Sequence, residues 1–214
     1  MRLFFIVLLL FAGASQAADY SALPESTLGF STSFQGEVFE GKFSKFTPQI
    51  RFDPSQLANS RFDVRITLAS ANTRNDERDQ MLRSVDFFDI AKRPEARFTA
   101  TRFRALGGNR YAADGSLSLH GISKPVSLIF SWTPGAKTVL VGEATLKRLD
   151  FGVGSGDWAD TDTLPNAVKV KTPPGIGCRA QIGQERKTRT CASAKGQASS
   201  APLSSRRNTG TRAP

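Results

Sequence analysis

Between residues 19 and 172 the chain has no cysteine and one histidine, His120. Without cysteine, this segment cannot be held by disulfides or carry a zinc site built on thiolates. A single histidine excludes a histidine-rich metal site, and any Ser-His-Asp or Cys-His catalytic system would have to use His120. We therefore expect neither a metal nor a cofactor in this segment.

Long apolar runs are also scarce. The longest, Leu3–Phe11, has nine residues, whereas about 20 are needed to cross a bilayer as a helix. It follows Arg2 and precedes the small residues of segment 12–18, which is the order of a secretory signal peptide. The sequence predicts a cleaved signal peptide over residues 1–17 and a mature protein in the periplasm.

Positive charge is unevenly distributed. The 214-residue chain has a net charge of +10, a balance typical of proteins that bind nucleic acid or anionic membranes. Segment 173–214 has eight basic residues and one acidic residue, whereas segment 19–172 has 20 basic and 18 acidic residues. Because the larger segment is nearly neutral, we expect no nucleic-acid binding by it.

Segment 173–214 also lacks aromatic residues and contains both cysteines, Cys178 and Cys191. It cannot bury enough apolar surface to offset the entropy of ordering, which predicts a disordered tail. A polybasic arm and a Cys178–Cys191 disulfide loop remain open. We favour an extension not native to the fold, because Pro173 and Pro174 interrupt a predicted strand.

The segment from 18 to 172 is predicted to be one all-β domain. Phe62, Val64, Ile66 and Leu68 alternate with polar residues, as in a strand with one buried and one solvated face. Similar runs bring the count to about eight strands. They cover residues 27–34, 41–52, 61–68, 97–104, 110–119, 125–132, 138–149 and 166–171.

One segment departs from this alternation. Residues 75–88 are highly charged and carry apolar residues at helical spacing behind Asn72, so we expect a short helix there. Eight mostly antiparallel strands favour a closed or nearly closed barrel, because closure removes exposed sheet edges. An immunoglobulin-like sandwich is the alternative, although its Cys-Trp-Cys spacing is missing.

The filling of this barrel bears on function. Segment 19–172 contains thirteen phenylalanines, and an eight-stranded barrel either packs solid or holds one small apolar ligand. Composition alone favours the solid core, because phenylalanine is commonly buried in any fold. An enzyme with His120, or with Asp76 and Asp79, as acid or base is a second hypothesis. A hairpin histidine and salt-bridged surface carboxylates are the simpler interpretation of these residues.

The chain from about residue 20 to 171 resembles the YceI-like family of exported, lipocalin-like β-barrels that bind polyisoprenoid lipids. The resemblance rests on short motifs in the same order along the chain. They are Ser26–Phe30, Gln35–Phe43, Phe52–Pro54, Arg78–Leu82 with Asp86–Asp89, Pro94–Phe98, Gly115–Val126 and Arg148–Gly154. The chain departs from the family in its interrupted last strand and in having Ala22–Ser26 where many relatives have a histidine.

The resemblance implies an eight-stranded antiparallel lipocalin-like barrel whose interior holds a lipid. The expected ligand is a polyisoprenoid or an isoprenoid quinone, carried without chemical change, and transient membrane contact and a homodimer are open expectations. Strand phase and family position together give the residues expected to line the ligand site. They are Phe30, Phe34, Phe43, Val64, Ile66, Phe88, Leu117, Leu119, Phe130 and Phe151.

Overall fold

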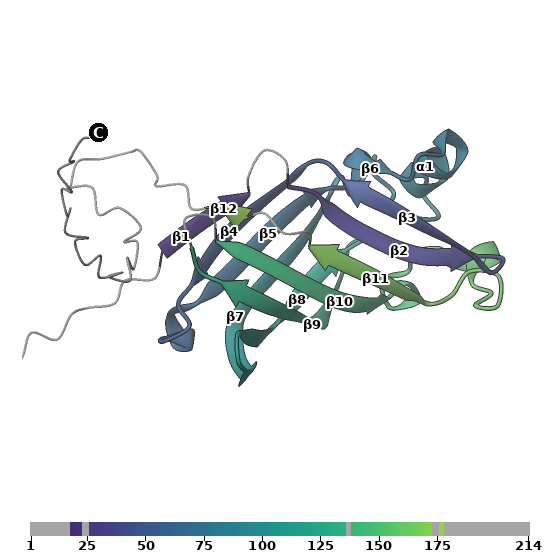
Figure 1. Cartoon of the computed structure of the whole chain (residues 1–214). Coiled ribbons are helices and arrows are strands. Elements are labelled where there is room, and N and C mark those ends of the chain that lie inside the picture. The colour runs from purple at the N-terminus through teal and green to yellow at the C-terminus, as the bar shows by residue number, and fades with distance from the viewer. Residues whose placement is uncertain (1–17, 23–25, 136–137, 173–175, 178–214) are drawn as a thin grey trace, which may run out of the picture.

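A computed structural model describes residues 18–22, 26–135, 138–172 and 176–177. The predicted signal peptide and nearly all of the predicted tail lie outside these residues. Within them, the chain forms one strongly curled antiparallel sheet with a single α-helix at one end (Figure 1). In the described part of the chain, no helix has the length and apolar character needed to cross a membrane.

The sheet contains twelve strands. In chain order they are β1 (Ala18–Ala22), β2 (Leu28–Phe34), β3 (Glu37–Phe43), β4 (Phe46–Phe52), β5 (Arg61–Thr67), β6 (Ala71–Asn72), β7 (Glu95–Gly107), β8 (Arg110–Leu119), β9 (Ile122–Thr133), β10 (Val139–Lys147), β11 (Ala167–Thr172) and β12 (Ile176–Gly177). The helix is α1 (Asp76–Arg83), and short 3-10 turns occur at η1 (Leu57–Asn59), η2 (Leu68–Ser70), η3 (Arg148–Phe151) and η4 (Gly156–Trp158).

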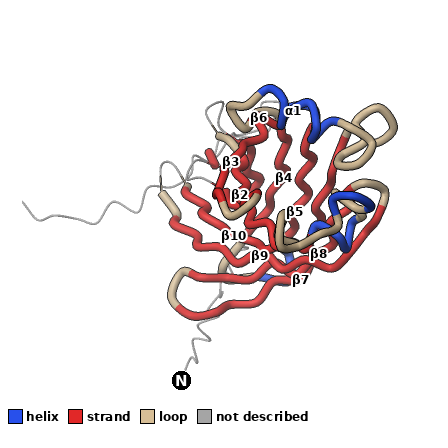
Figure 2. The backbone as a smooth tube through the Cα atoms, turned by 90° about the vertical axis from the view of Figure 1, so that its right-hand side faces the viewer, coloured by secondary structure: helices blue, strands red, loops and turns tan. Residues whose placement is uncertain are grey.

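These strands belong to eight segments of chain, because four segments are interrupted. The interrupted pairs are β1 with β2, β3 with β4, β5 with β6, and β11 with β12. Each of the eight segments pairs with two neighbours, and the last segment returns to the first through β11–β2 and β12–β1. Figure 2 shows the resulting curl of the strands. The predicted lipocalin-like antiparallel fold is therefore confirmed.

The predicted count of eight strands needs correction. Ten strands are longer than two residues, because the run predicted over 41–52 breaks at Ser44 and Lys45 into β3 and β4, and β1 was not predicted. The prolines at 173 and 174 lie outside the described residues. After them, Ile176 and Gly177 pair with Ala22 and Ser21, so two residues of the predicted tail contribute to the sheet.

Local sequence explains both the strands and their turns. In β5, Phe62 and Ile66 are buried while Arg61 and Arg65 are exposed, as the two-residue period predicts. The β8–β9 hairpin turns through His120 and Gly121, whose φ angles are 52° and 78°. Two consecutive positive φ values are the geometry of a tight type I′ turn. His120 is thus first of all a turn residue.

The helix is shorter than predicted. Asn75 caps α1, since its side chain accepts a hydrogen bond from the backbone N–H of Arg78 at 2.9 Å. The helix ends at Arg83, although residues 75–88 were predicted. The backbone of Ser84 is extended, with φ −66° and ψ 170°, and its N–H bonds to the Met81 carbonyl. Phe87 and Phe88 lie beyond this residue and are both buried. The chain leaves the helix at Ser84, and both rings then enter the interior.

The interior differs between the two ends of the barrel. At the end away from α1, seven rings form a continuous aromatic cluster, with neighbouring ring centres 4.8 to 6.1 Å apart. Its members are Tyr20, Phe52, Phe62, Phe103, Tyr111, Phe130 and Trp132. This end is a solid core, whereas the end beside α1 is hollow.

Candidate functional site

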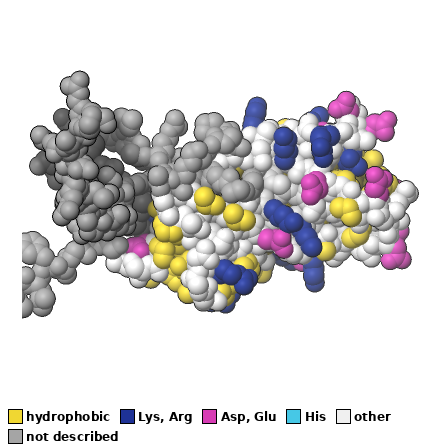
Figure 3. Space-filling model, in the orientation of Figure 1, with side chains coloured by type: hydrophobic (Ala, Val, Ile, Leu, Met, Phe, Trp, Pro, Cys, Tyr) yellow, Lys and Arg dark blue, Asp and Glu magenta, His cyan; other side chains and the backbone are white. Residues whose placement is uncertain are grey.

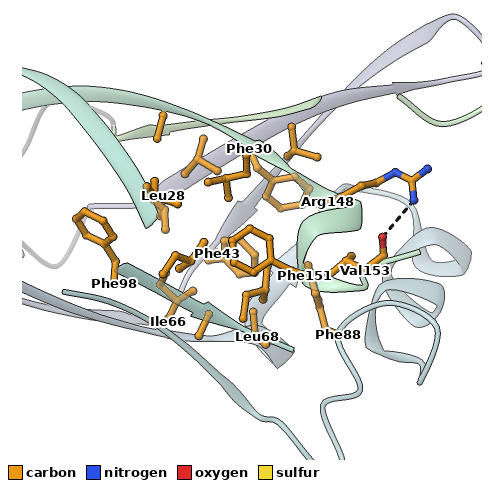
Figure 4. Close-up of a pocket in the computed structure, with 18 of the residues that line it drawn as sticks. Leu28, Phe30, Phe43, Ile66, Leu68, Phe88, Phe98, Arg148, Phe151 and Val153 are labelled. Carbon is orange, nitrogen blue, oxygen red and sulfur yellow. Dashed lines mark hydrogen bonds between the residues drawn. The ribbon is translucent and has the colours of Figure 1, made fainter. Parts of the chain in front are cut away.

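An apolar cavity of about 200 Å³ occupies the barrel end beside α1 (Figure 4). It is lined by side chains of eight of the longer strands together with residues of η2, of α1, of the segment after α1 and of the loop that begins with η3. Of the 26 lining residues, 23 are apolar, and the others are Thr32, Arg148 and Thr172. A cavity with so few polar groups suits a hydrocarbon ligand.

Eight of the ten residues predicted to contact the ligand line this cavity. They are Phe30, Phe43, Val64, Ile66, Phe88, Leu117, Leu119 and Phe151. Figure 4 shows Phe30, Phe43, Ile66, Phe88 and Phe151 converging on the same space from different elements.

The other two predicted residues, Phe34 and Phe130, are not among the lining residues. Phe34 lies at the end of β2, where its ring centre is 6.2 Å from that of Trp158. Phe130 is 1% exposed and belongs to the aromatic cluster, 5.2 Å from Phe62. Strand phase showed correctly that both side chains point inward, but it carries no information on depth along the barrel axis.

Several lining residues were not predicted. On the strands they include Leu28 and Phe98, whose inward phase was visible in the sequence. Others lie outside the strands, in α1 and in the loops at the end of the barrel, where no periodicity marks them. These are Leu82, Phe87, Val153 and Leu164.

Glycines in two of the family-like motifs make room for cavity rings. The ring of Phe30 lies over Gly41 of the paired strand, where a Cβ atom would be 2.2 Å from the Phe30 Cζ. In the same way, a Cβ on Gly115 would be 2.9 Å from the Phe98 ring and 2.3 Å from a backbone oxygen. Both glycines are therefore needed for close approach rather than for an unusual backbone angle.

Arg148 is the only charged lining residue, and it is 5% exposed. Its guanidinium donates to five backbone carbonyls, so all five of its N–H groups are used. The acceptors are Val153 at 3.1 Å, Trp158 at 2.7 Å, Leu164 at 2.7 Å, Pro165 at 3.2 Å, and Gly154. Burial lowers the pKa of Arg148. The dashed line in Figure 4 marks the bond to Val153.

These bonds organise the loop over residues 148–166, here called the cap loop. The cap loop is joined to its neighbours by two backbone hydrogen bonds. The N–H of Gly154 donates to the Asp86 carbonyl at 2.7 Å, and the N–H of Gln35 donates to the Thr163 carbonyl at 2.8 Å. The ring of Trp158 lies 5.5 Å from Phe87. The cap loop therefore connects β2 and the segment after α1 across this end of the barrel.

His120 does not point into the cavity as a catalytic group. Its Nδ1 lies 3.2 Å from the carbonyl oxygen of Phe151, which requires the proton to be on Nδ1. Its Nε2 is buried and has no hydrogen-bond partner among the described residues. Among the described residues, the ring therefore has no hydrogen bond to a carboxylate or a hydroxyl.

The carboxylates of α1 are also committed elsewhere. Asp79 is buried, and its Oδ1 accepts bonds from the backbone N–H of Thr73 at 2.8 Å and from the Thr73 hydroxyl at 2.7 Å. Asp76 is exposed on the first helical turn. Across the described residues, no group of three or more His, Cys, Asp or Glu side chains is placed to share a metal ion.

Taken together, the barrel and its apolar cavity define the class of lipocalin-like binding proteins. The model of the YceI-like domain matches residues 22–173, so the chain belongs to the YceI-like family. A UPF0312 protein of Vibrio parahaemolyticus is 30% identical over 169 residues, which cover 72% of this chain and 89% of that protein.

Two solved structures extend the comparison. Burkholderia cenocepacia BcnA has a TM-score of 0.69 and 28% identity, with 73% of this chain and 99% of that chain covered. A polyisoprenoid binding domain from Saccharophagus degradans has a TM-score of 0.58 and 18% identity, with 77% of this chain and 100% of that chain covered. The likeness to the Saccharophagus degradans domain shows that the two chains share a fold.

Proposed function

We propose that this protein is an exported, non-catalytic carrier that holds an isoprenoid lipid inside the barrel. The observation that carries the proposal is the lining of the cavity, with 23 apolar residues of 26. The YceI-like family membership and the fold shared with a polyisoprenoid binding domain support an isoprenoid chain as the ligand. The nine-residue apolar run after Arg2 supports export to the periplasm.

Binding would be driven by burial of hydrocarbon. Each buried CH₂ group contributes roughly 0.8 kcal/mol, so a few isoprene units supply micromolar affinity without polar contacts. Such a ligand is insoluble in water, so loading would involve transient contact with a membrane. A polyisoprenoid and an isoprenoid quinone both satisfy this description, because their chains are alike.

Binding is favoured over catalysis by the placement of the candidate acid and base groups. His120 is held in a turn against the Phe151 carbonyl, and Asp79 is bonded to Thr73. Neither group is among the cavity-lining residues. Reactive groups that face a substrate would have to converge on one point within the cavity.

The test uses a variant that fills the cavity. Ala144 lines the cavity from β10, and Thr145 is exposed on the other face of the same strand. Native mass spectrometry of protein purified from its own periplasm should show a bound isoprenoid in the wild type and in Thr145→Phe. The Ala144→Phe variant should lose it. A ligand-free wild type, or equal occupancy in both variants, would refute the carrier function.

A further inference from the structure

The polar side chains that line the cavity have no free hydrogen-bond donor left for a ligand. Arg148 uses all five N–H groups on backbone carbonyls. The Thr32 hydroxyl donates to the carbonyl of Ala167 at 3.3 Å. The Thr172 hydroxyl accepts from the backbone N–H of Gly142 at 2.6 Å and donates to the Gly142 carbonyl at 3.5 Å. A head group that accepts hydrogen bonds therefore needs a donor just outside the lining.

Arg78 is placed to be that partner. Its Cζ lies 4.2 Å from the ring centre of Phe39, and Phe39 is itself a half-buried residue of the cavity lining. Among the described residues, no other charged side chain stacks on a ring of the lining. The guanidinium therefore lies at the edge of the cavity, on the side where α1 meets β3.

The position of this guanidinium is fixed from one edge only. Arg78 Nε donates to the Thr73 hydroxyl at 3.0 Å, and that hydroxyl donates to Asp79 Oδ1 at 2.7 Å. Arg78 Nη2 makes a long bond of 3.5 Å to the Thr73 carbonyl. Among the described residues, Arg78 has no ion pair with a carboxylate, and its Nη1 has no hydrogen-bond partner. The free edge presents N–H groups in the fork that matches an oxyanion.

We propose that Arg78 binds the oxyanion head group, phosphate or carboxylate, of the lipid whose chain fills the cavity. This inference rests on the proposed carrier function. The aromatic face of Phe39 covers one side of the cation, so an oxyanion there forms charge-assisted bonds in a partly desolvated place. A neutral head group, such as an alcohol or a quinone, leaves the positive charge without a counter-ion.

The acidic side chains around Arg78 do not attract an anionic head group at long range. Acidic side chains gather at the end of the molecule that carries α1 (Figure 3), and Asp76 and Glu77 are exposed on the same helical turn. Selectivity for an anion must therefore come from direct contact with Arg78. This makes the removal of that one side chain a decisive perturbation.

The experiment compares three ligands with one chain and different head groups. They are geranylgeranyl phosphate, geranylgeranoic acid and geranylgeraniol, and their affinities are measured for the wild type and for Arg78→Gln. Arg83→Gln is the matched control, since Arg83 is exposed at the last turn of the same helix. We expect the wild type to bind one or both anions at least about tenfold more tightly than the alcohol. The preference should disappear in Arg78→Gln and persist in Arg83→Gln.

The outcomes separate this inference from the carrier function. If the alcohol binds the wild type as tightly as both anions, or if both glutamine variants lose the preference equally, Arg78 is not the head-group site. If none of the three ligands binds, the carrier function itself fails and the inference with it. Should Arg78→Gln fail to fold, Arg78→Lys serves instead, because it keeps the charge but loses the planar fork and should retain only part of the preference.

Discussion

Arg148 offers the sharpest test of how this barrel is built, because one side chain holds five carbonyls of the cap loop. The Arg148→Met variant keeps much of the apolar stem and removes every donor. Net contributions of hydrogen bonds to a charged group are about 1.5–3 kcal/mol each, but the buried guanidinium also loses solvation. We therefore expect a net loss of about 3–5 kcal/mol, because each carbonyl left buried and unpaired costs about 1–3 kcal/mol and several lose their donor together.

The carbonyl groups decide where the loss appears. Val153, Leu164 and Trp158 would each keep a buried acceptor without a donor, unless the cap loop opens to water. Opening is the cheaper response, so the damage should be local. Arg148→Lys retains the charge but can serve at most three of the five carbonyls. Its loss should be smaller, at about 2 kcal/mol.

Two measurements check this reasoning. Urea unfolding gives the loss of stability, and native-state hydrogen exchange of the Gly154 and Gln35 amides reports the cap loop, since these amides bond to Asp86 and Thr163 across it. Exchange at both amides should accelerate in Arg148→Met, while amides of β8 remain protected. A loss below about 1 kcal/mol, or unchanged exchange at Gly154, would show that the five carbonyls do not depend on Arg148.

Three other changes test separate parts of the structure. Gly41→Val places a side chain where the Phe30 ring lies, so it should cost about 1–3 kcal/mol by urea unfolding and also weaken ligand binding. Two hydrogen bonds from Arg97, at 2.6 and 2.8 Å, lower the pKa of Asp63 from 3.8 to about 2. Because Arg97 is 46% exposed, the pair should contribute only roughly 1 kcal/mol, fully present above about pH 4 and lost as the pH falls through 2. Asp63→Asn should remove this part of the pH dependence, and an unchanged acid limb would refute it. Phe130→Leu should lower stability by about 1–2 kcal/mol without changing ligand affinity, because Phe130 does not line the cavity.

Strand phase allowed much of the fold to be predicted, because it depends on neighbours in the sequence. The inward faces of β5, β8 and β9 follow directly from a two-residue period. The interruptions within segments leave a weaker mark. In residues 41–52 the buried positions change from odd to even numbers after Phe43, and this change of phase coincides with the break at Ser44 and Lys45. There the backbone N–H of Ser44 bonds to the Ser70 carbonyl at 3.4 Å.

The cap loop could not be predicted for a different reason. An isolated arginine in a polar sequence normally predicts an exposed side chain. The five carbonyls that surround Arg148 come from positions 153 to 165, and only the folded loop brings them together. Resemblance to a family marked the motif Arg148–Gly154 but assigned no role to its arginine. The folded structure shows that Arg148 holds the cap loop together through these five hydrogen bonds.

The total number of phenylalanines does not show whether the barrel packs solid or holds a cavity. The positions of the aromatic residues along the strands are more informative. On β5, Val64 and Ile66 line the cavity and Phe62 belongs to the aromatic cluster. On β9, Leu128 lines the cavity and Phe130 belongs to the cluster. On β8, Leu117 lines the cavity and Tyr111 belongs to the cluster. Strands β5, β8 and β9 thus change from aliphatic to aromatic in the same direction along the barrel. Strand β7, which lies between β5 and β8, instead has a ring at both levels, Phe98 in the lining and Phe103 in the cluster.

Such a gradient has a direct consequence inside a narrow barrel. The interior of an eight-stranded barrel is just wide enough for side chains to fill, and the seven cluster rings fill it at one end. On β5, β8 and β9 the aromatic residues stand at this packed end and the aliphatic residues at the hollow end. The hollow end also contains seven phenylalanines, from β2, β3, β7, η3 and the segment after α1, so the number of rings does not by itself decide which end packs solid. Once strands and their directions are assigned, this order of residues is visible in the sequence itself. The same order places Phe130 in the aromatic cluster and not in the cavity lining, since its ring meets those of Phe52 and Phe62.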